Sequence, residues 1–122
     1  MRILGLHHAQ ITIPPGEEAR AREFYCGLLA LPEVPKPASL AGRGGFWLQA
    51  GVAQVHVGVE AGGDRAQSKA HVAYEVDDLA AWRGKLRAAG FALVDGEPIP
   101  GYDRFEIRDP FGNRLELLQP IS

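Results

Sequence analysis

Alternating and helical spacings of apolar residues predict a strand followed by a helix at the start of the chain. Residues 6–13 alternate between apolar and polar positions, the period of a half-buried strand. Residues 14–16, Pro-Pro-Gly, end this strand. Over residues 17–29 the apolar positions share one helical face, and two early glutamates suit the positive end of the helix dipole.

The middle of the chain favours extended structure. Four of the nine residues over 31–39 are proline or lysine, so we expect an irregular extended piece there rather than a core strand. Two strands are predicted at 46–50 and 53–60, separated by Gly51. Residues 61–68 are polar and glycine-rich, which is typical of a linker.

After the linker the pattern begins again. Residues 71–76 alternate as a strand, and a helix is predicted over 79–89. Either Asp77 or Asp78 can cap this helix, and Gly90 stands where a left-handed end is expected. Three further strands are predicted at 91–94, 102–108 and 114–119.

The two halves of the chain repeat one plan. His8 and His71 each open a strand of the form His-x-x-Φ-x-Φ just before a helix, where Φ is apolar. His56 and Glu116 each lie between two apolar residues in a late strand of their half. Such repetition organises a whole fold. We therefore predict an α+β fold of two βαβββ modules, about 1–62 and 68–120, within a single domain over 1–122. Their curved mixed sheet would form an open cup with the helices on its outer face.

Composition narrows the possible partners and location. The net charge of −2 offers no basic stripe for nucleic acid, and no run of eighteen apolar residues suggests a membrane span. The single cysteine, Cys26, cannot form an intrachain disulfide. We expect a cytoplasmic protein that binds neither nucleic acid nor membrane.

Four residues on the polar phase of their strands are candidates for metal binding. His8, His56, His71 and Glu116 would project into the cup, on the side away from the helices. Three imidazoles and one carboxylate suit one divalent first-row ion, namely Zn, Mn, Fe(II), Co or Ni. Any two of the histidines with the carboxylate would suit non-haem Fe(II).

A simpler interpretation stands beside the metal site. A lone strand histidine is more often a hydrogen-bonded, half-buried residue than a ligand, and Glu116 alone would pair with Arg104 or Arg114. His7 falls on the helix-packing phase, so we expect a structural or rim position for it.

Four segments of the chain resemble the vicinal oxygen chelate superfamily of glyoxalase I, bleomycin-resistance proteins and extradiol dioxygenases. Residues 6–14 and 21–31 are similar to the opening strand and helix end of a first module, and residues 70–79 to the opening of a second. Residues 109–117, Asp-Pro-Phe-Gly-Asn-Arg-Leu-Glu-Leu, are similar to its closing signature, the most specific of these matches. The resemblance spans nearly the entire chain.

This resemblance implies roles for individual residues. His8, His71 and Glu116 match positions that hold metal in many members. His56 matches a fourth position that is typically glutamate in glyoxalase I. A neutral imidazole there leaves a bound metal more electropositive and removes a candidate carboxylate base, so the chain departs from glyoxalase I proper. The resemblance also implies a homodimer.

Two functions follow as hypotheses. In the first, the chain is a metal-dependent lyase, isomerase or dioxygenase acting on a small substrate with vicinal oxygens. Glu116 and Glu75, or His56, would move protons. Arg104 and Tyr102 would orient the substrate. In the second, the chain is a metal-free small-molecule binding or drug-resistance protein whose cup is lined by aromatic residues such as Trp47 and Tyr102.

Overall fold

The computed structural model describes residues 1–121, and the chain divides into two compact units, with the boundary between Gly63 and Asp64. Each unit carries a mixed sheet and its own helix, so the predicted α+β class is confirmed. No helix within residues 1–121 has the length and apolar character that crossing a bilayer requires. That the two modules form a single domain stays a prediction.

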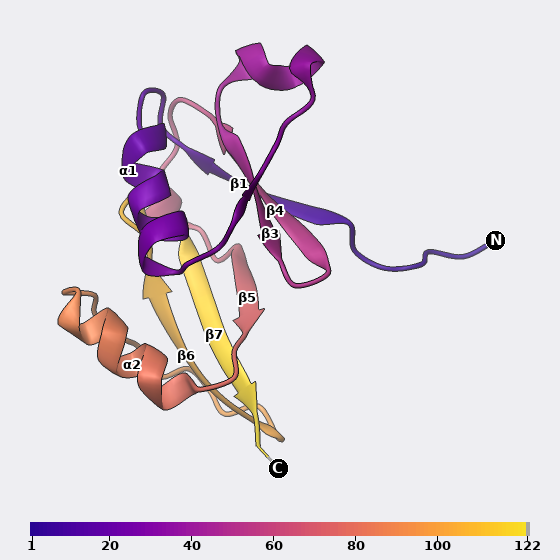
Figure 1. The fold of residues 1–122 in the computed structure, drawn as a ribbon. Helices are drawn as coiled ribbons and strands as arrows, with labels where there is room; N and C mark the ends of the chain where they lie inside the picture. The colour runs from indigo at the N-terminus through magenta and orange to yellow at the C-terminus, as the bar shows by residue number, and fades with distance from the viewer. Residues whose placement is uncertain (122) are drawn as a thin grey trace. The chain divides into compact units, whose positions relative to one another are not determined.

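The first unit follows the order strand, helix, three strands. Its sheet has the order β1-β4-β3-β2, with β1 parallel to β4 and the other neighbours antiparallel (Figure 1). The elements are β1 (His8–Ile13), α1 (Glu18–Arg22), the π-helical segment η1 (Glu23–Leu28), β2 (Glu33–Val34), the 3-10 helix η2 (Ala38–Arg43), β3 (Phe46–Ala50) and β4 (Ala53–Val59).

The helix predicted over 17–29 is divided between α1 and the π-helical segment η1. The wider turn is closed by a bond from the Leu29 N–H to the Phe24 carbonyl, five residues back. In an ordinary α-helix, adjacent side chains point about 100° apart around the axis. The π-helical segment η1 nevertheless buries two adjacent side chains, Phe24 and Tyr25, in the core.

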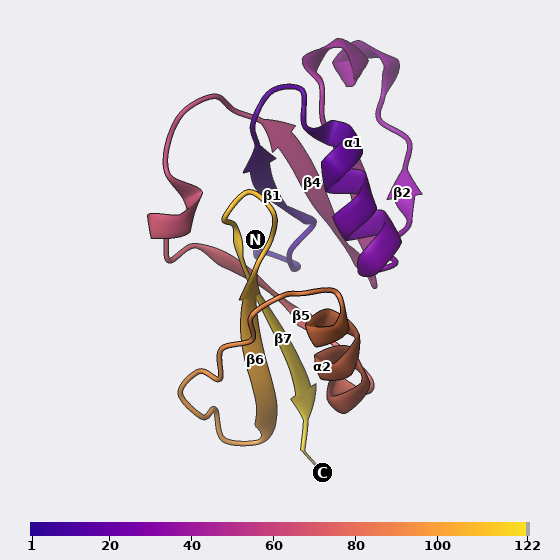
Figure 2. The ribbon, with the colours of Figure 1, turned by 90° about the vertical axis from the view of Figure 1, so that its left-hand side faces the viewer.

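The second unit repeats this plan with a three-stranded sheet of order β5-β7-β6 (Figure 2). Here β5 is parallel to β7, and β6 is antiparallel to β7. The elements are the 3-10 helix η3 (Arg65–Gln67), β5 (His71–Glu75), α2 (Leu79–Ala88), β6 (Tyr102–Arg108) and β7 (Arg114–Pro120). Of the two predicted caps for α2, Asp78 is used, accepting a bond from the Ala81 N–H at 3.1 Å.

The predicted strand over 91–94 is wrong in extent. Within the described chain this segment forms only an isolated antiparallel bridge between Val94 and Glu106. Pro98 and Pro100 follow it and carry no N–H for a strand ladder, so the chain continues to β6 as a loop. We call residues 95–100 the Gly96 loop.

Strand register places the polar residues alike in both units. In the first unit His8 pairs with Gln54, and His56 lies two residues further along the central strand. In the second unit His71 pairs with Arg114, and Glu116 lies two residues further. Opposite these central residues stand Trp47 on β3 and Glu106 on β6. The residues that alternate with these on β4, β6 and β7 are apolar and buried: Val55, Val57, Phe105, Ile107, Leu115 and Leu117.

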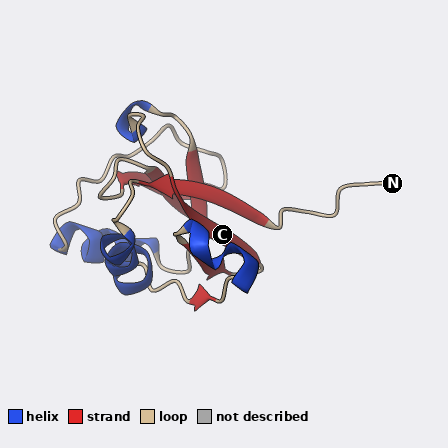
Figure 3. Ribbon diagram, turned by 90° about the horizontal axis from the view of Figure 1, so that it is seen from above, coloured by secondary structure: helices blue, strands red, loops and turns tan. Residues whose placement is uncertain are grey.

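The chain before β1 carries no helix or strand. Figure 3 shows this N-terminal segment running outward from β1 as a loop. Its apolar side chains Ile3, Leu4 and Leu6 are 93%, 87% and 88% exposed.

Candidate functional site

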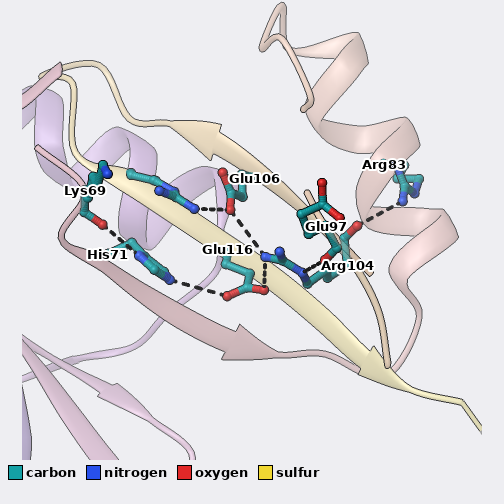
Figure 4. Close-up of polar contacts among 8 residues, drawn as sticks. Lys69, His71, Arg83, Glu97, Arg104, Glu106 and Glu116 are labelled. Atoms are coloured by element: carbon teal, nitrogen blue, oxygen red, sulfur yellow. Dashed lines mark hydrogen bonds and ion pairs between the residues drawn. The ribbon is translucent and has the colours of Figure 1, made fainter. Parts of the chain in front are cut away.

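In the second unit, His71 and Glu116 face each other across two neighbouring strands. The Nδ1 atom of His71 lies 2.9 Å from the Lys69 carbonyl oxygen. Because a carbonyl can only accept, Nδ1 is the donor, and in a neutral ring Nε2 then carries a lone pair. This Nε2 lies 3.6 Å from Oε2 of Glu116 (Figure 4).

This geometry fits two ligands of one cation. A lone pair and a carboxylate oxygen at this separation repel each other unless a proton or a cation lies with them. Two ligand atoms on a tetrahedral ion, each about 2.1 Å from it, are about 3.4 Å apart. Metal-bound histidines commonly donate their other ring N–H to a carbonyl, as His71 does to Lys69. Alternatively, a protonated His71 would pair with Glu116 as a metal-free salt bridge.

Glu116 is buried, with 5% of the residue exposed, and its second oxygen is bound to an arginine. Arg104 Nη1 donates to Oε1 of Glu116 at 2.6 Å and to Oε1 of Glu106 at 3.3 Å. Arg114 also donates to Glu106. The hydrogen bond to Glu116 raises the pKa of Arg104 above its usual value. Burial alone would raise the pKa of Glu106, but Arg114 and Arg104 hold it below its usual value.

In the first unit, His8, His56 and Trp47 form a stack of rings. The His56 ring lies 4.0 Å from that of His8 at 13°, and 3.9 Å from that of Trp47 at 3°. Nε2 of His56 is 2.9 Å from Oε1 of Gln54. Burial is the main cause of a lowered pKa for His56, followed by electrostatic repulsion of its protonated form by His8, His7 and Lys36.

Stacked rings are a poor arrangement for chelation. The nitrogen lone pairs lie in the ring planes, so two parallel imidazoles direct them side by side rather than at one point. His8 and His56 would have to turn out of the stack to share an ion. Within residues 1–121 no group of three or more His, Cys, Asp or Glu side chains is placed to hold a metal ion. The four predicted ligands lie two in each unit.

The other predicted site residues are spread over the sheets. Trp47 contacts His56 in the ring stack, whereas Glu75 is exposed on β5 and pairs in register with Leu118. Tyr102 is exposed at the start of β6, four residues before Glu106 and about 13 Å from it along the strand. His7 is exposed just before β1, with Nδ1 2.9 Å from Nδ1 of His8. Arg104 lies beside Glu116.

Sequence reasoning missed three partners of these residues. Glu106 lies on the same phase as Arg104 in β6, so strand alternation could have identified it. Gln54 falls on the phase of His56 in β4 and could have been found in the same way. The Lys69 carbonyl is a backbone group, so no pattern of side chains in the sequence could have predicted its contact with His71.

The chain matches one protein family model over most of its length. Residues 5–117 match the model described as the glyoxalase, bleomycin resistance protein and dioxygenase superfamily. A solved structure of a glyoxalase family protein from Bacillus anthracis is 36% identical in sequence, with a TM-score of 0.91. The alignment covers 99% of this chain and 100% of that one.

More distant solved structures share the fold. Lactoylglutathione lyase from Agrobacterium tumefaciens is 17% identical with a TM-score of 0.71, over 97% of this chain and 95% of that one. TnmS3, an antibiotic binding protein from Streptomyces sp. CB03234, is 16% identical with a TM-score of 0.71, over 98% of this chain and 100% of that one. No curated protein matches this chain.

Proposed function

Because the chain belongs to the glyoxalase, bleomycin resistance protein and dioxygenase superfamily, we propose that it is a divalent-metal-dependent enzyme. Its substrate would be a small molecule with two adjacent oxygen atoms, and its reaction that of a lyase, isomerase or dioxygenase. The observation that carries the proposal is the pair His71 and Glu116. Their facing atoms lie 3.6 Å apart, and the tautomer of His71 is set by the Lys69 carbonyl.

The proposed ligands are His8, His56, His71 and Glu116. A divalent first-row ion such as Zn, Mn, Fe(II), Co or Ni, when bound there, would supply a Lewis acid able to stabilise negative charge on a substrate oxygen. The Lys69 carbonyl holds the His71 ring in place. The stack with Trp47 buries the His56 ring, and this burial lowers the pKa of His56, which favours the neutral form that a metal ligand needs.

The remaining site residues have proposed roles toward the substrate and its protons. Glu75 is exposed on β5 and on the same strand phase as His71, so its carboxylate can accept a substrate proton. Glu116 would serve the same purpose through Oε2, the oxygen that Arg104 does not bind, where it is not a ligand of the ion. Arg104 and Tyr102 on β6, with Trp47 on β3, are proposed to contact the substrate.

Metal content tests this proposal directly. We expect protein purified without affinity tag or chelator to hold near one equivalent of metal per site by inductively coupled plasma mass spectrometry. His71→Ala and Glu116→Ala should both lose the metal, because each removes one of the two facing ligand atoms. Glu23→Ala, which removes an exposed glutamate side chain, should keep it.

A wild-type protein that is purified without metal and that also fails to bind added Zn, Mn, Fe(II), Co and Ni would exclude the metal-dependent function. A metal-free small-molecule binding protein is then the second candidate. The ion pair of Arg104 with Glu116 favours it, because this pair satisfies the buried carboxylate without a metal. This second function would be supported if aromatic ligands quench the fluorescence of Trp47 in the wild type and do not quench it in His56→Ala.

A further inference from the structure

Arg104 holds Glu116 by the carboxylate oxygen that does not face His71. Its Nη1 lies 2.6 Å from Oε1 of Glu116, while Oε2 of the same carboxylate faces Nε2 of His71 at 3.6 Å. Figure 4 shows Arg104 and His71 approaching Glu116 from opposite sides. A charge-assisted bond this short fixes the rotation of the carboxylate. Oε2 is therefore kept toward His71.

The guanidinium of Arg104 is itself held by the Gly96 loop. Its Nε donates to the Glu97 carbonyl oxygen at 2.9 Å. The loop is tied to helix α2 through Arg83, whose Nη1 lies 2.8 Å from Oδ1 of Asp95 and whose Nη2 donates to the Arg104 carbonyl at 3.4 Å. Backbone and side chain of Arg104 are thus both restrained.

Gly96 leaves the space that the guanidinium occupies. A Cβ atom at residue 96 would lie 2.6 Å from Nη2, 2.8 Å from Cζ and 3.0 Å from Nη1 of Arg104. These distances are shorter than van der Waals contact, so any side chain at 96 forces the guanidinium to move. Gly96 is not among the glycines with positive φ, so its backbone conformation is open to alanine. The substitution would displace Arg104 without straining the loop.

We propose that Arg104 is a positioning residue for Glu116, and that the absence of a side chain at Gly96 sets the affinity of the metal site. This inference rests on the proposed function. Because Oε1 is bound by Arg104, Glu116 would have only Oε2 to offer to an ion.

Two variants that keep the charge of Arg104 separate its position from its electrostatic effect. Gly96→Ala would move the guanidinium. Arg104→Lys would replace the planar guanidinium, with its several N–H donors, by a single ammonium group of the same charge. Mutation of a residue that orients a metal ligand typically weakens metal binding about 10–100-fold. We expect both variants to bind Zn²⁺ about tenfold more weakly or worse in competition titrations with a chromogenic chelator.

Matched controls lie on helix α2. Gly84→Ala adds the same methyl group at a position with no neighbouring atom within 4 Å, and Arg87→Lys makes the same exchange at an exposed residue. Both should bind Zn²⁺ as the wild type does. Unchanged affinity in Gly96→Ala and Arg104→Lys would overturn the inference.

A second measurement needs no metal. In metal-free protein, NMR of the imidazole nitrogens should show a shift of the His71 Nε2 resonance in Gly96→Ala and no shift in Gly84→Ala. If the wild type binds no Zn²⁺, the proposed function fails, and this measurement still decides whether Gly96 positions Glu116. An unshifted His71 resonance in Gly96→Ala would then overturn that role as well.

Discussion

At the scale of single residues, His56 is the clearest conflict between burial and charge. Only 5% of the residue is exposed, and its ring is held between those of His8 and Trp47. A protonated imidazole there would lose hydration and face the charges of neighbouring histidines. The folded protein therefore favours the neutral ring, which is also the form that a metal requires.

This burial predicts a pH dependence of stability in metal-free protein. The pKa of His56 in the folded state lies below its ordinary value of 6.5, so the unfolded chain binds the proton more readily. The free energy of unfolding should be highest above pH about 6.5 and fall as the pH drops below it. Urea denaturation between about pH 5 and pH 8 measures this slope. His56→Gln should flatten the slope, and identical slopes in both proteins would contradict the prediction.

At the scale of elements, α2 and η1 are each followed by a residue in the left-handed conformation. Gly90 follows α2 with φ of +91°, and the Phe91 N–H bonds to the Leu86 carbonyl. Ala30 follows η1 with φ of +58°, and the Leu31 N–H bonds to the Tyr25 carbonyl. Glycine adopts this left-handed conformation freely, whereas alanine is strained in it.

Ala30→Gly should therefore stabilise the protein. Relief of left-handed strain is worth about 1–2 kcal/mol, and the extra freedom of glycine in the unfolded chain offsets about 0.5–1 kcal/mol. We expect the free energy of unfolding to rise by about 0.5–1 kcal/mol in urea titrations. Ala30 is exposed, so no core contact is lost. Gly90→Ala should lower stability, and a loss of stability in Ala30→Gly would refute the argument.

At the scale of the whole molecule, the chain exposes features that a second copy could cover. Strand β1 ends one sheet and β5 ends the other, and an edge strand offers unpaired backbone groups. Ile3, Leu4 and Leu6 are almost fully exposed before β1. The homodimer predicted from family resemblance would remove such surface from water.

Sedimentation equilibrium tests this prediction. We expect a mass about twice the 13.2 kDa of one chain at micromolar concentration. Dilution should produce a reversible approach to the mass of one chain, because the predicted dimer is not covalent. A single-chain mass at every concentration would exclude the homodimer and would require each metal site to be completed within one chain.

The sequence by itself determined most of the strands and which face each strand residue takes. The bounds of β3 and β6 agree with the predicted strands at 46–50 and 102–108, because alternation is a property of neighbouring residues. The same alternation placed His56 and Glu116 among the polar side chains. It failed over 91–94, where a short apolar run forms only a bridge, because pairing there depends on the distant Glu106.

Only the tertiary structure decided which polar groups meet. The bonds of Arg104 to Glu116 and of His71 to the Lys69 carbonyl depend on strand order and register, which join segments far apart in the chain. The stack of His56 on Trp47 likewise follows from the pairing of β3 with β4. Alternation gives each side chain a face but not a neighbour, since a neighbour is set by how separate strands align.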